Sequence, residues 1–174
     1  MRLLWIAAVV ASLGLSLAAS GCANEPLDVA PTVDLTRFQG QWYEIAKLPR
    51  TTQAQCTGTT AFYQLREGGL DVTNQCHLIT LTGSPKTSLA RVNATGEGVN
   101  SKMSIEVGGF NGDYWILEVG EHYEYAVIGV PSREYLWIMS RTPQLEKTVV
   151  DGIVSRMREK KFDTSRLEFT LQGT

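Results

Sequence analysis

Histidine and clustered basic residues are scarce in this sequence. Its 174 residues include two histidines, His77 and His122, which lie far apart and show no metal-ligand spacing with Cys or Asp. The 16 Lys and Arg residues form no cluster and are outnumbered by 18 Asp and Glu residues, which argues against a nucleic-acid partner. A phosphate-binding loop and a nucleophile elbow are also missing. We therefore predict no metal, no cofactor and no catalytic residue.

Long apolar runs are equally few, and the one that stands out lies at the N-terminus. Residues 3–19 are almost entirely apolar and follow the charged start Met1-Arg2. This pattern is typical of a signal peptide. The run is shorter than the roughly 20 residues that a transmembrane helix needs. The rest of the chain has the length of a single domain.

Small residues precede the first of only three cysteines. The segment Ala19-Ser20-Gly21-Cys22 resembles the bacterial lipoprotein processing box, which implies removal of residues 1–21 and lipidation of Cys22. Ala23 resembles the pattern of lipoproteins sent on to the outer membrane. We predict a lipid-anchored tether over 22–33 and one folded domain over 34–174. The alternative is an ordinary secretory signal with Cys22 incidental.

The other two cysteines form a candidate pair. If Cys22 carries lipid, Cys56 and Cys76 remain in an oxidising compartment, where a disulfide is the default. They flank a hairpin whose turn is at 67–69, and simple pairing places Cys56 a few residues past Cys76. The bridge therefore needs a bulge or an irregular approach before Thr59. The alternative is two free thiols, one of them reactive.

Short segments rich in β-branched and aromatic residues alternate with turn signals along most of the chain. Even spacing with hairpin turns is the pattern of an up-and-down antiparallel barrel. The expected strands are 42–48, 57–65, 70–78, 88–96, 103–107, 114–119, 123–130 and 135–140. The fold class is therefore all-β, with eight strands in the barrel.

The period then changes from two to between three and four residues. Thr142 is expected to cap a helix, with Pro143 at its first position. Its apolar stripe is Leu145, Val149, Ile153 or Val154, and Met157. This stripe needs the outer face of the barrel to cover it, and residues 166–171 return to alternation as a short ninth strand.

Two segments about a hundred residues apart carry a family signature. Gly40 and Trp42 open the first strand, and Arg141 follows the eighth, where its cation can cover the indole. Together they resemble the lipocalin family over roughly 34–170. The segment 135–143 looks like the form found in bacterial outer-membrane lipocalins. The family's second signature is only partly kept, with Tyr123 present and 120–122 standing where an Asp is expected.

The segment 135–139 is bulky and apolar on both faces, so both faces are covered. If the helix covers Leu136 and Ile138, then Tyr135, Trp137 and Met139 point into the barrel as candidate ligand-binding residues. An eight-stranded barrel has room for one small ligand. The alternative is that these side chains fill the interior.

One carboxylate is also expected inside the barrel. Glu44 shares parity with Trp42, and a buried charge without a partner is costly. We therefore expect Glu44 to pair with an Arg or a Lys.

The resemblance implies a binding protein without catalysis. The implied function is storage or transport of small hydrophobic molecules, fatty acids or lysophospholipids, at the bacterial outer membrane, with a role in envelope maintenance and the domain facing the periplasm. The alternatives are a haem enzyme using His77 or His122, a thiol enzyme using Cys56 or Cys76, and a protein-recognition module. The sequence leaves open whether two copies form a homodimer.

Overall fold

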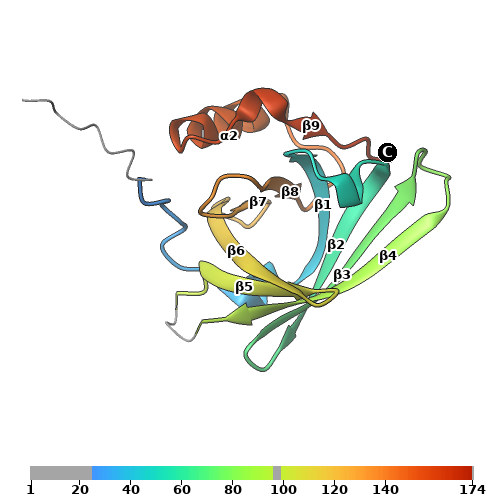
Figure 1. Ribbon diagram of the computed structural model, residues 1–174. Helices are drawn as coiled ribbons and strands as arrows, with labels where there is room; N and C mark the ends of the chain where they lie inside the picture. Colours follow the sequence, from blue (N-terminus) through green and yellow to red (C-terminus); the bar gives the residue numbers. More distant parts are fainter. Residues whose placement is uncertain (1–24, 96–98, 174) are drawn as a thin grey trace, which may run out of the picture.

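The computed structural model describes residues 25–95 and 99–173. Eight strands form a closed antiparallel barrel, and a ninth lies outside it (Figure 1). The strands are β1 (Gly40–Lys47), β2 (Cys56–Arg66), β3 (Gly69–Leu78), β4 (Pro85–Ala94), β5 (Lys102–Val107), β6 (Phe110–Val119), β7 (Tyr125–Gly129), β8 (Leu136–Ser140) and β9 (Glu168–Phe169). The predicted signal peptide, Cys22 and Gly96 lie outside the described residues.

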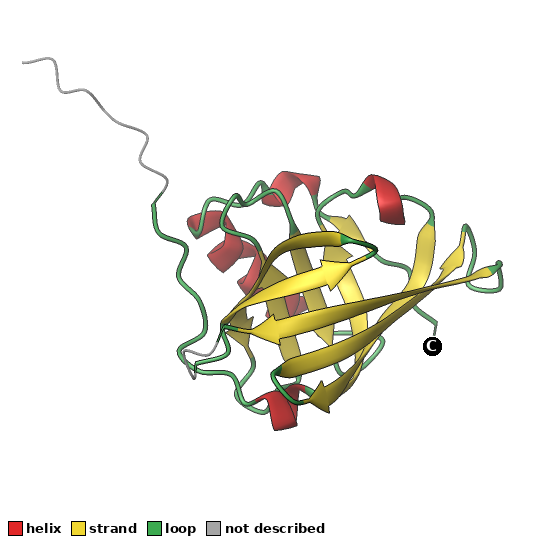
Figure 2. Cartoon of the chain, turned by 60° about the horizontal axis from the view of Figure 1, so that its bottom comes forward, coloured by secondary structure: helices red, strands yellow, loops and turns green. Residues whose placement is uncertain are grey.

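Each strand pairs with the next, and β1 closes the barrel by pairing with both β2 and β8. The short β9 then adds to β1, with Ala46 opposite Phe169. Figure 2 shows the strands wrapped around one interior, with the helices at its periphery. This arrangement confirms the predicted up-and-down barrel with a ninth strand.

A single helical turn, α1 (Leu35–Phe38), leads into the barrel. The Asp34 carboxylate accepts hydrogen bonds from the backbone N–H groups of Thr36 and Arg37 and so caps the turn. The turn places the fully buried Phe38 against Trp42, with ring centroids 4.9 Å apart. This end of the barrel is thereby closed.

The main helix, α2 (Lys147–Glu159), begins later than the sequence predicts. Glu146, and not Thr142, is its N-cap residue, and Pro143 lies before it. The Thr142 hydroxyl instead donates to the carbonyl of Gln144 at 2.6 Å, so it forms a local turn. The chain needs this turn to pass from the end of β8 to the outer wall.

The helix packs on the barrel wall as expected. Its buried residues are Val150, Ile153 and Met157, and they form one cluster with Leu136 and Ile138 of β8. Figure 1 shows α2 beside β7 and β8, outside the barrel. The predicted stripe is correct for Ile153 and Met157, whereas Val150 is buried in place of the half-buried Val149 and Leu145 lies before the helix. No helix in the described ranges is long and apolar enough to cross a membrane.

The strands β6, β4 and β9 differ most from the prediction. The strand β6 starts at Phe110 because Gly108 and Gly109 alone make the turn, with φ of 55° and 81°. The strand β4 starts at Pro85, where a missing N–H is tolerated at the first position. The ninth strand shrinks to two residues because residues 164–166 form a 3₁₀ turn, η2 (Thr164–Arg166).

The segment before α1 packs against the barrel. Leu27, Ala30 and Val33 are buried, and the N–H of Ala30 donates to the carbonyl of Ile116 at 3.0 Å. The N–H of Val33 donates in the same way to the carbonyl of Val99 at 2.9 Å. Part of the segment that was predicted to be a tether therefore packs on the barrel.

Candidate ligand-binding site

The closed end of the barrel is a cation stacked on an indole. The Arg141 guanidinium carbon lies 3.8 Å from the centroid of the Trp42 ring, and Trp42 is fully buried. Arg141 also donates to the carbonyls of Gln41 and Phe38 at 2.9 and 3.2 Å. Gly40 has φ of 97°, a conformation that favours glycine, and a Cβ there would lie 3.4 Å from the Arg141 side chain. The predicted closure is confirmed.

Two tyrosines form the floor above this plug. The hydroxyls of Tyr63 on β2 and Tyr114 on β6 lie 2.6 Å apart, and both side chains are buried. Burial raises the pKa of Tyr63 to about 12 and that of Tyr114 well above its usual value. Both hydroxyls are therefore neutral at physiological pH. Three strands separate β2 from β6, so the pair spans the barrel.

A cavity of about 730 Å³ opens above this floor, and every barrel strand contributes to its lining. A volume of this size suits one small molecule. Side chains therefore do not fill the interior, and the walls are largely apolar. The apolar lining includes Ala61, Val72, Ala90, Ile105, Val107, Ile128 and Met139.

The predicted ligand-binding residues lie at this cavity. Tyr135, Trp137 and Met139 all line it, while Leu136 and Ile138 are buried beneath α2 on the other side of β8. The Tyr135 and Trp137 rings are stacked with centroids 6.1 Å apart. The predicted parity of β8 is thus correct, and contact of these residues with a ligand remains a prediction.

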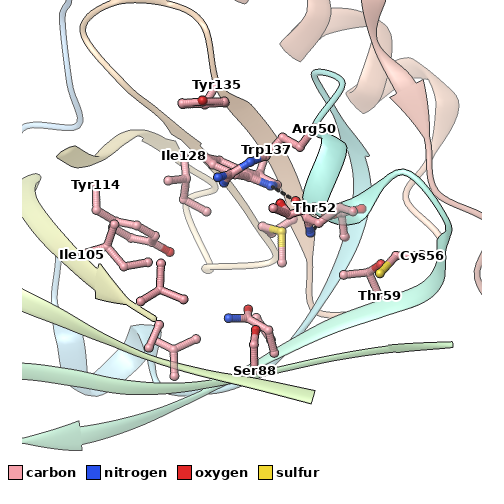
Figure 3. A pocket seen from close by; sticks show the side chains of 18 of the residues that line it. Arg50, Thr52, Cys56, Thr59, Ser88, Ile105, Tyr114, Ile128, Tyr135 and Trp137 are labelled. Carbon is pink, nitrogen blue, oxygen red and sulfur yellow. Dashed lines mark hydrogen bonds between the residues drawn. The ribbon is translucent and has the colours of Figure 1, made fainter. Parts of the chain in front are cut away.

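Two cations stand at the open mouth, and sequence reasoning missed both. The Arg50 guanidinium carbon lies 4.5 Å from the Tyr135 ring centroid and 5.0 Å from that of Trp137 (Figure 3). Lys86 on β4 also lines the cavity, and its ammonium donates to the carbonyl of Thr52 at 2.8 Å. No carboxylate within 25–95 and 99–173 pairs with either. A signal existed in the sequence, because Arg50 opens the polar segment 50–55 directly after the first strand.

The mouth is braced by a disulfide between Cys56 and Cys76, whose Cα atoms are 5.4 Å apart. Cys56 pairs with Leu78, and the ladder is irregular between Thr57 and Thr60. The predicted bridge and the predicted irregular approach are both confirmed. The two thiols of the alternative thiol enzyme are consumed in this bond.

Glu44 also lines the cavity, but it lacks the expected Arg or Lys partner. The Thr170 hydroxyl donates to its Oε1 at 2.5 Å, and the Gln53 amide donates to Oε2 at 3.3 Å. Lys47 pairs instead with Glu168 at 2.7 Å, because Lys47 faces away along the strand toward β9. Burial raises the pKa of Glu44, against the hydrogen bond from Thr170 and the charge of Lys47.

The sequence matches the model of the family described as a lipocalin-like domain over residues 33–172. The chain belongs to the lipocalin family. It is similar to the outer membrane lipoprotein Blc of Vibrio cholerae, at 32% identity over 90% of this chain and 94% of the relative. It is also similar to the temperature-induced lipocalin-1 of Arabidopsis thaliana, at 32% identity over 86% of this chain and 85% of the relative.

Solved structures support the fold of this lipocalin. Insecticyanin from the tobacco hornworm Manduca sexta aligns with a TM-score of 0.65 at 24% identity, over 84% of this chain and 85% of that one. Lobster apocrustacyanin A1 aligns with a TM-score of 0.66 at 16% identity, over 86% and 92%. Membership of the family supports the binding of a small hydrophobic molecule.

The partly kept second signature of this lipocalin lies at the closed end. The Tyr123 hydroxyl accepts from the Asp34 N–H at 2.8 Å, and the Arg37 guanidinium stacks on the Tyr123 ring at 4.2 Å. The Tyr123 carbonyl accepts from Arg141 at 3.3 Å. Tyr123 therefore ties this turn to the plug even without the expected Asp.

The two histidines lie away from the cavity of this lipocalin. Neither His77 nor His122 is among its lining residues, and His122 is exposed. Within the part of the chain that the structure describes, no three His, Cys, Asp or Glu side chains converge on one point. A haem in this cavity would therefore find neither His77 nor His122 among the residues that line it.

Proposed function

We propose that this lipocalin binds one single-chain amphiphile, a fatty acid or a lysophospholipid, and stores or transports it without catalysis. The observation that carries the proposal is an apolar cavity of about 730 Å³ whose mouth holds Arg50 and Lys86. The acyl chain lies in the cavity above Tyr63 and Tyr114, and the acidic head group lies at the mouth.

Burial of the acyl chain supplies most of the affinity. A buried methylene contributes about 0.8 kcal/mol, so about ten of them correspond to roughly 8 kcal/mol, the free energy of micromolar binding. The cost of ordering the chain reduces this figure. The apolar walls therefore select for the length of the acyl chain, and the residues at the mouth bind the head group.

The mouth suits a carboxylate or a phosphate. A guanidinium that stacks on aromatic rings keeps its N–H donors free at its edge, where they bind planar anions. Arg50 stacks in this way on Tyr135 and Trp137, and Lys86 adds a second positive charge across the mouth. An anionic head group satisfies both.

The place of action that we propose is the outer membrane, with the barrel facing the periplasm and Cys22 carrying the lipid anchor. The support is the processing box before Cys22 and the similarity to proteins that are named outer membrane lipoprotein Blc in Vibrio cholerae and in Escherichia coli. A carrier of lipids in this position serves envelope maintenance.

The test is displacement of Nile red, a neutral fluorescent probe, by ligands with a twelve-carbon chain. Dodecanoate and lauroyl lysophosphatidylglycerol should bind about tenfold more tightly than dodecanol, as expected for a charge-assisted contact. Arg50→Ala should remove most of this difference. The matched control is Arg91→Ala, because Arg91 lies on the exterior of β4 and pairs with Asp71.

Two outcomes would contradict the proposal. One is an absence of Nile red binding and of displacement by any twelve-carbon ligand. The other is an equal effect of the Arg50 and Arg91 substitutions on dodecanoate affinity, which would show that the mouth does not hold the head group.

A further inference from the structure

The strands β1 and β2 separate on one wall of the cavity, and the C-terminus fills the gap. Their pairing ends with Tyr43 opposite Thr60. Residues 170–172, which we call the C-terminal strap, continue from there. The Thr170 N–H donates to the Ile45 carbonyl at 2.9 Å, and the Gly58 N–H donates to the Leu171 carbonyl at 2.7 Å.

The strap links the backbones of two polar residues of the cavity wall. The Gln172 amide nitrogen lies 2.8 Å from both the Glu44 carbonyl and the Thr59 carbonyl, so these residues are direct neighbours across the gap. Both side chains line the cavity. Their exposed fractions are only 1% and 5%, so water satisfies little of either.

The Thr59 hydroxyl is buried and unpartnered. Within the described ranges it has no hydrogen-bond partner, whereas Thr57 on the same strand donates to the His77 carbonyl at 3.1 Å. Buried hydroxyls nearly always have a partner. An unpaired hydroxyl in the wall of a binding cavity therefore points to a partner supplied by the ligand.

The charge of Glu44 is also uncompensated. Its hydrogen bonds come from the neutral groups of Thr170 and Gln53, and the one cation that acts on it, Lys47, is already paired with Glu168. Two carboxylates thus share one ammonium, which leaves one negative charge beside the cavity. Burial raises the pKa of Glu44 because it removes water from the carboxylate, the Glu168 charge adds to the effect, and a cation in the cavity would offset the cost.

We propose that Glu44 and Thr59 form a subsite for a primary ammonium group of the ligand. An ammonium carries three N–H donors and a positive charge. It therefore supplies the missing charge to the Glu44 carboxylate and a donor to the Thr59 hydroxyl at the same time. The inference rests on the proposed function, because it assigns the head-group chemistry of a ligand in the same cavity.

The subsite is next to the cationic mouth. Gln53 of η1 (Thr51–Gln53) donates to Glu44, accepts from the Trp137 indole at 3.4 Å and has its N–H on the Arg50 carbonyl at 3.0 Å. One short loop thus links the anion-binding and ammonium-binding sides. An amphiphile with both charges, such as an aminophospholipid with one acyl chain, fits this arrangement.

The experiment compares two lipids with the same chain and the same phosphate. Lauroyl lysophosphatidylethanolamine should displace Nile red from the full domain about tenfold more effectively than lauroyl lysophosphatidylglycerol. Glu44→Gln should abolish this preference. Dodecylamine against dodecanol forms a second arm, which detects an ammonium that comes from a simple amine.

Two further variants make the result specific. Glu168→Gln removes a charge from the same cluster outside the cavity, so the ethanolamine preference should remain. Thr59→Val removes the unpartnered hydroxyl and should reduce the preference by about threefold. This second variant keeps the test decisive should Glu44→Gln fail to fold.

The outcomes separate the two proposals. Equal affinity of wild-type protein for both lysolipids, and for dodecylamine and dodecanol, overturns the subsite while the proposed function stands. Equal loss of preference in the Glu44 and Glu168 variants overturns it as well, because the effect is then a general one of charge. Failure of every lipid and amine to displace the probe overturns both.

Discussion

The two ends of this barrel are built on opposite rules. At the closed end, the indole N–H of Trp42 donates to the Phe38 carbonyl at 2.7 Å, and Arg141 covers the ring. At the open end, Arg50 has no carboxylate partner among the described residues and the Thr59 hydroxyl has none of any kind. Polar groups that are paired within the protein stabilise the fold, whereas polar groups without a partner are available to a ligand.

The largest expected contrast comes from the two tryptophans. Trp42→Ala should lower the free energy of unfolding by about 3–5 kcal/mol, because it empties a fully buried site. Trp137→Ala should cost roughly 1 kcal/mol, because one face of that ring borders the cavity. Urea unfolding followed by circular dichroism measures both. Equal costs would show that the mouth carries as much stability as the plug.

The disulfide tests whether the open end depends on a covalent brace. Replacing both Cys56 and Cys76 by Ser opens a loop of 20 residues and should cost on the order of 3 kcal/mol. Urea unfolding of this variant, beside wild-type protein with and without a reductant, gives the value. If the open end depends on this brace for its shape, the affinity for Nile red should also fall.

The pH dependence of stability should report Glu44. Its pKa is raised above the ordinary value of 4.5, so the folded state holds this proton more tightly than the unfolded state. The stabilisation is complete below pH 4.5 and is lost as pH rises through the folded pKa. Glu44→Gln lacks this loss, so its stability relative to wild type should increase between about pH 4 and about pH 7.

Urea unfolding at the two pH values checks this prediction, with Glu168→Gln as the control. The groups that face Glu44 are Lys47, Gln53 and Thr170, and Glu168 acts from behind Lys47. A difference between Glu44→Gln and wild type that stays constant with pH would mean that Glu44 titrates normally.

The smallest contrast lies between two threonines of β2. Thr59→Val should raise the free energy of unfolding by about 1 kcal/mol, because it removes a buried hydroxyl without a partner. Thr57→Val should lower it by about 1 kcal/mol, because that hydroxyl donates to His77. Thermal melting of the two variants resolves the opposite signs, and equal signs would show that Thr59 has a partner after all.

The closed end could be predicted from sequence, and the open end only in part. Gly40, Trp42 and Arg141 together match a family signature, so the resemblance located the plug although Arg141 lies about a hundred residues from Trp42. The orientation of the β8 side chains was also predicted, because apolar residues on both faces of that strand indicate that one face packs under a helix and the other lines the barrel.

The polar wall of the cavity could not be predicted. The partners of Glu44 come from the mouth loop and the C-terminal strap, which lie far apart in sequence, and no periodicity links Gln53 with Thr170. The start of α2 was missed because Thr142 and Pro143 form a plausible cap. The Thr142 hydroxyl is instead used by the turn that carries the chain around the barrel edge.

The position of β1 has a consequence for the order in which the molecule can form. It is the first strand to be synthesised, yet it pairs with β8 and β9, which come last. Contacts between distant parts of a chain are slow to form. While the later strands are still being made or exported, β1 keeps one edge open, and such an edge is prone to pair with other chains. The barrel closes only when β8, residues 136–140, arrives to pair with β1, so a chain that stalls before this strand would remain an open sheet for longer.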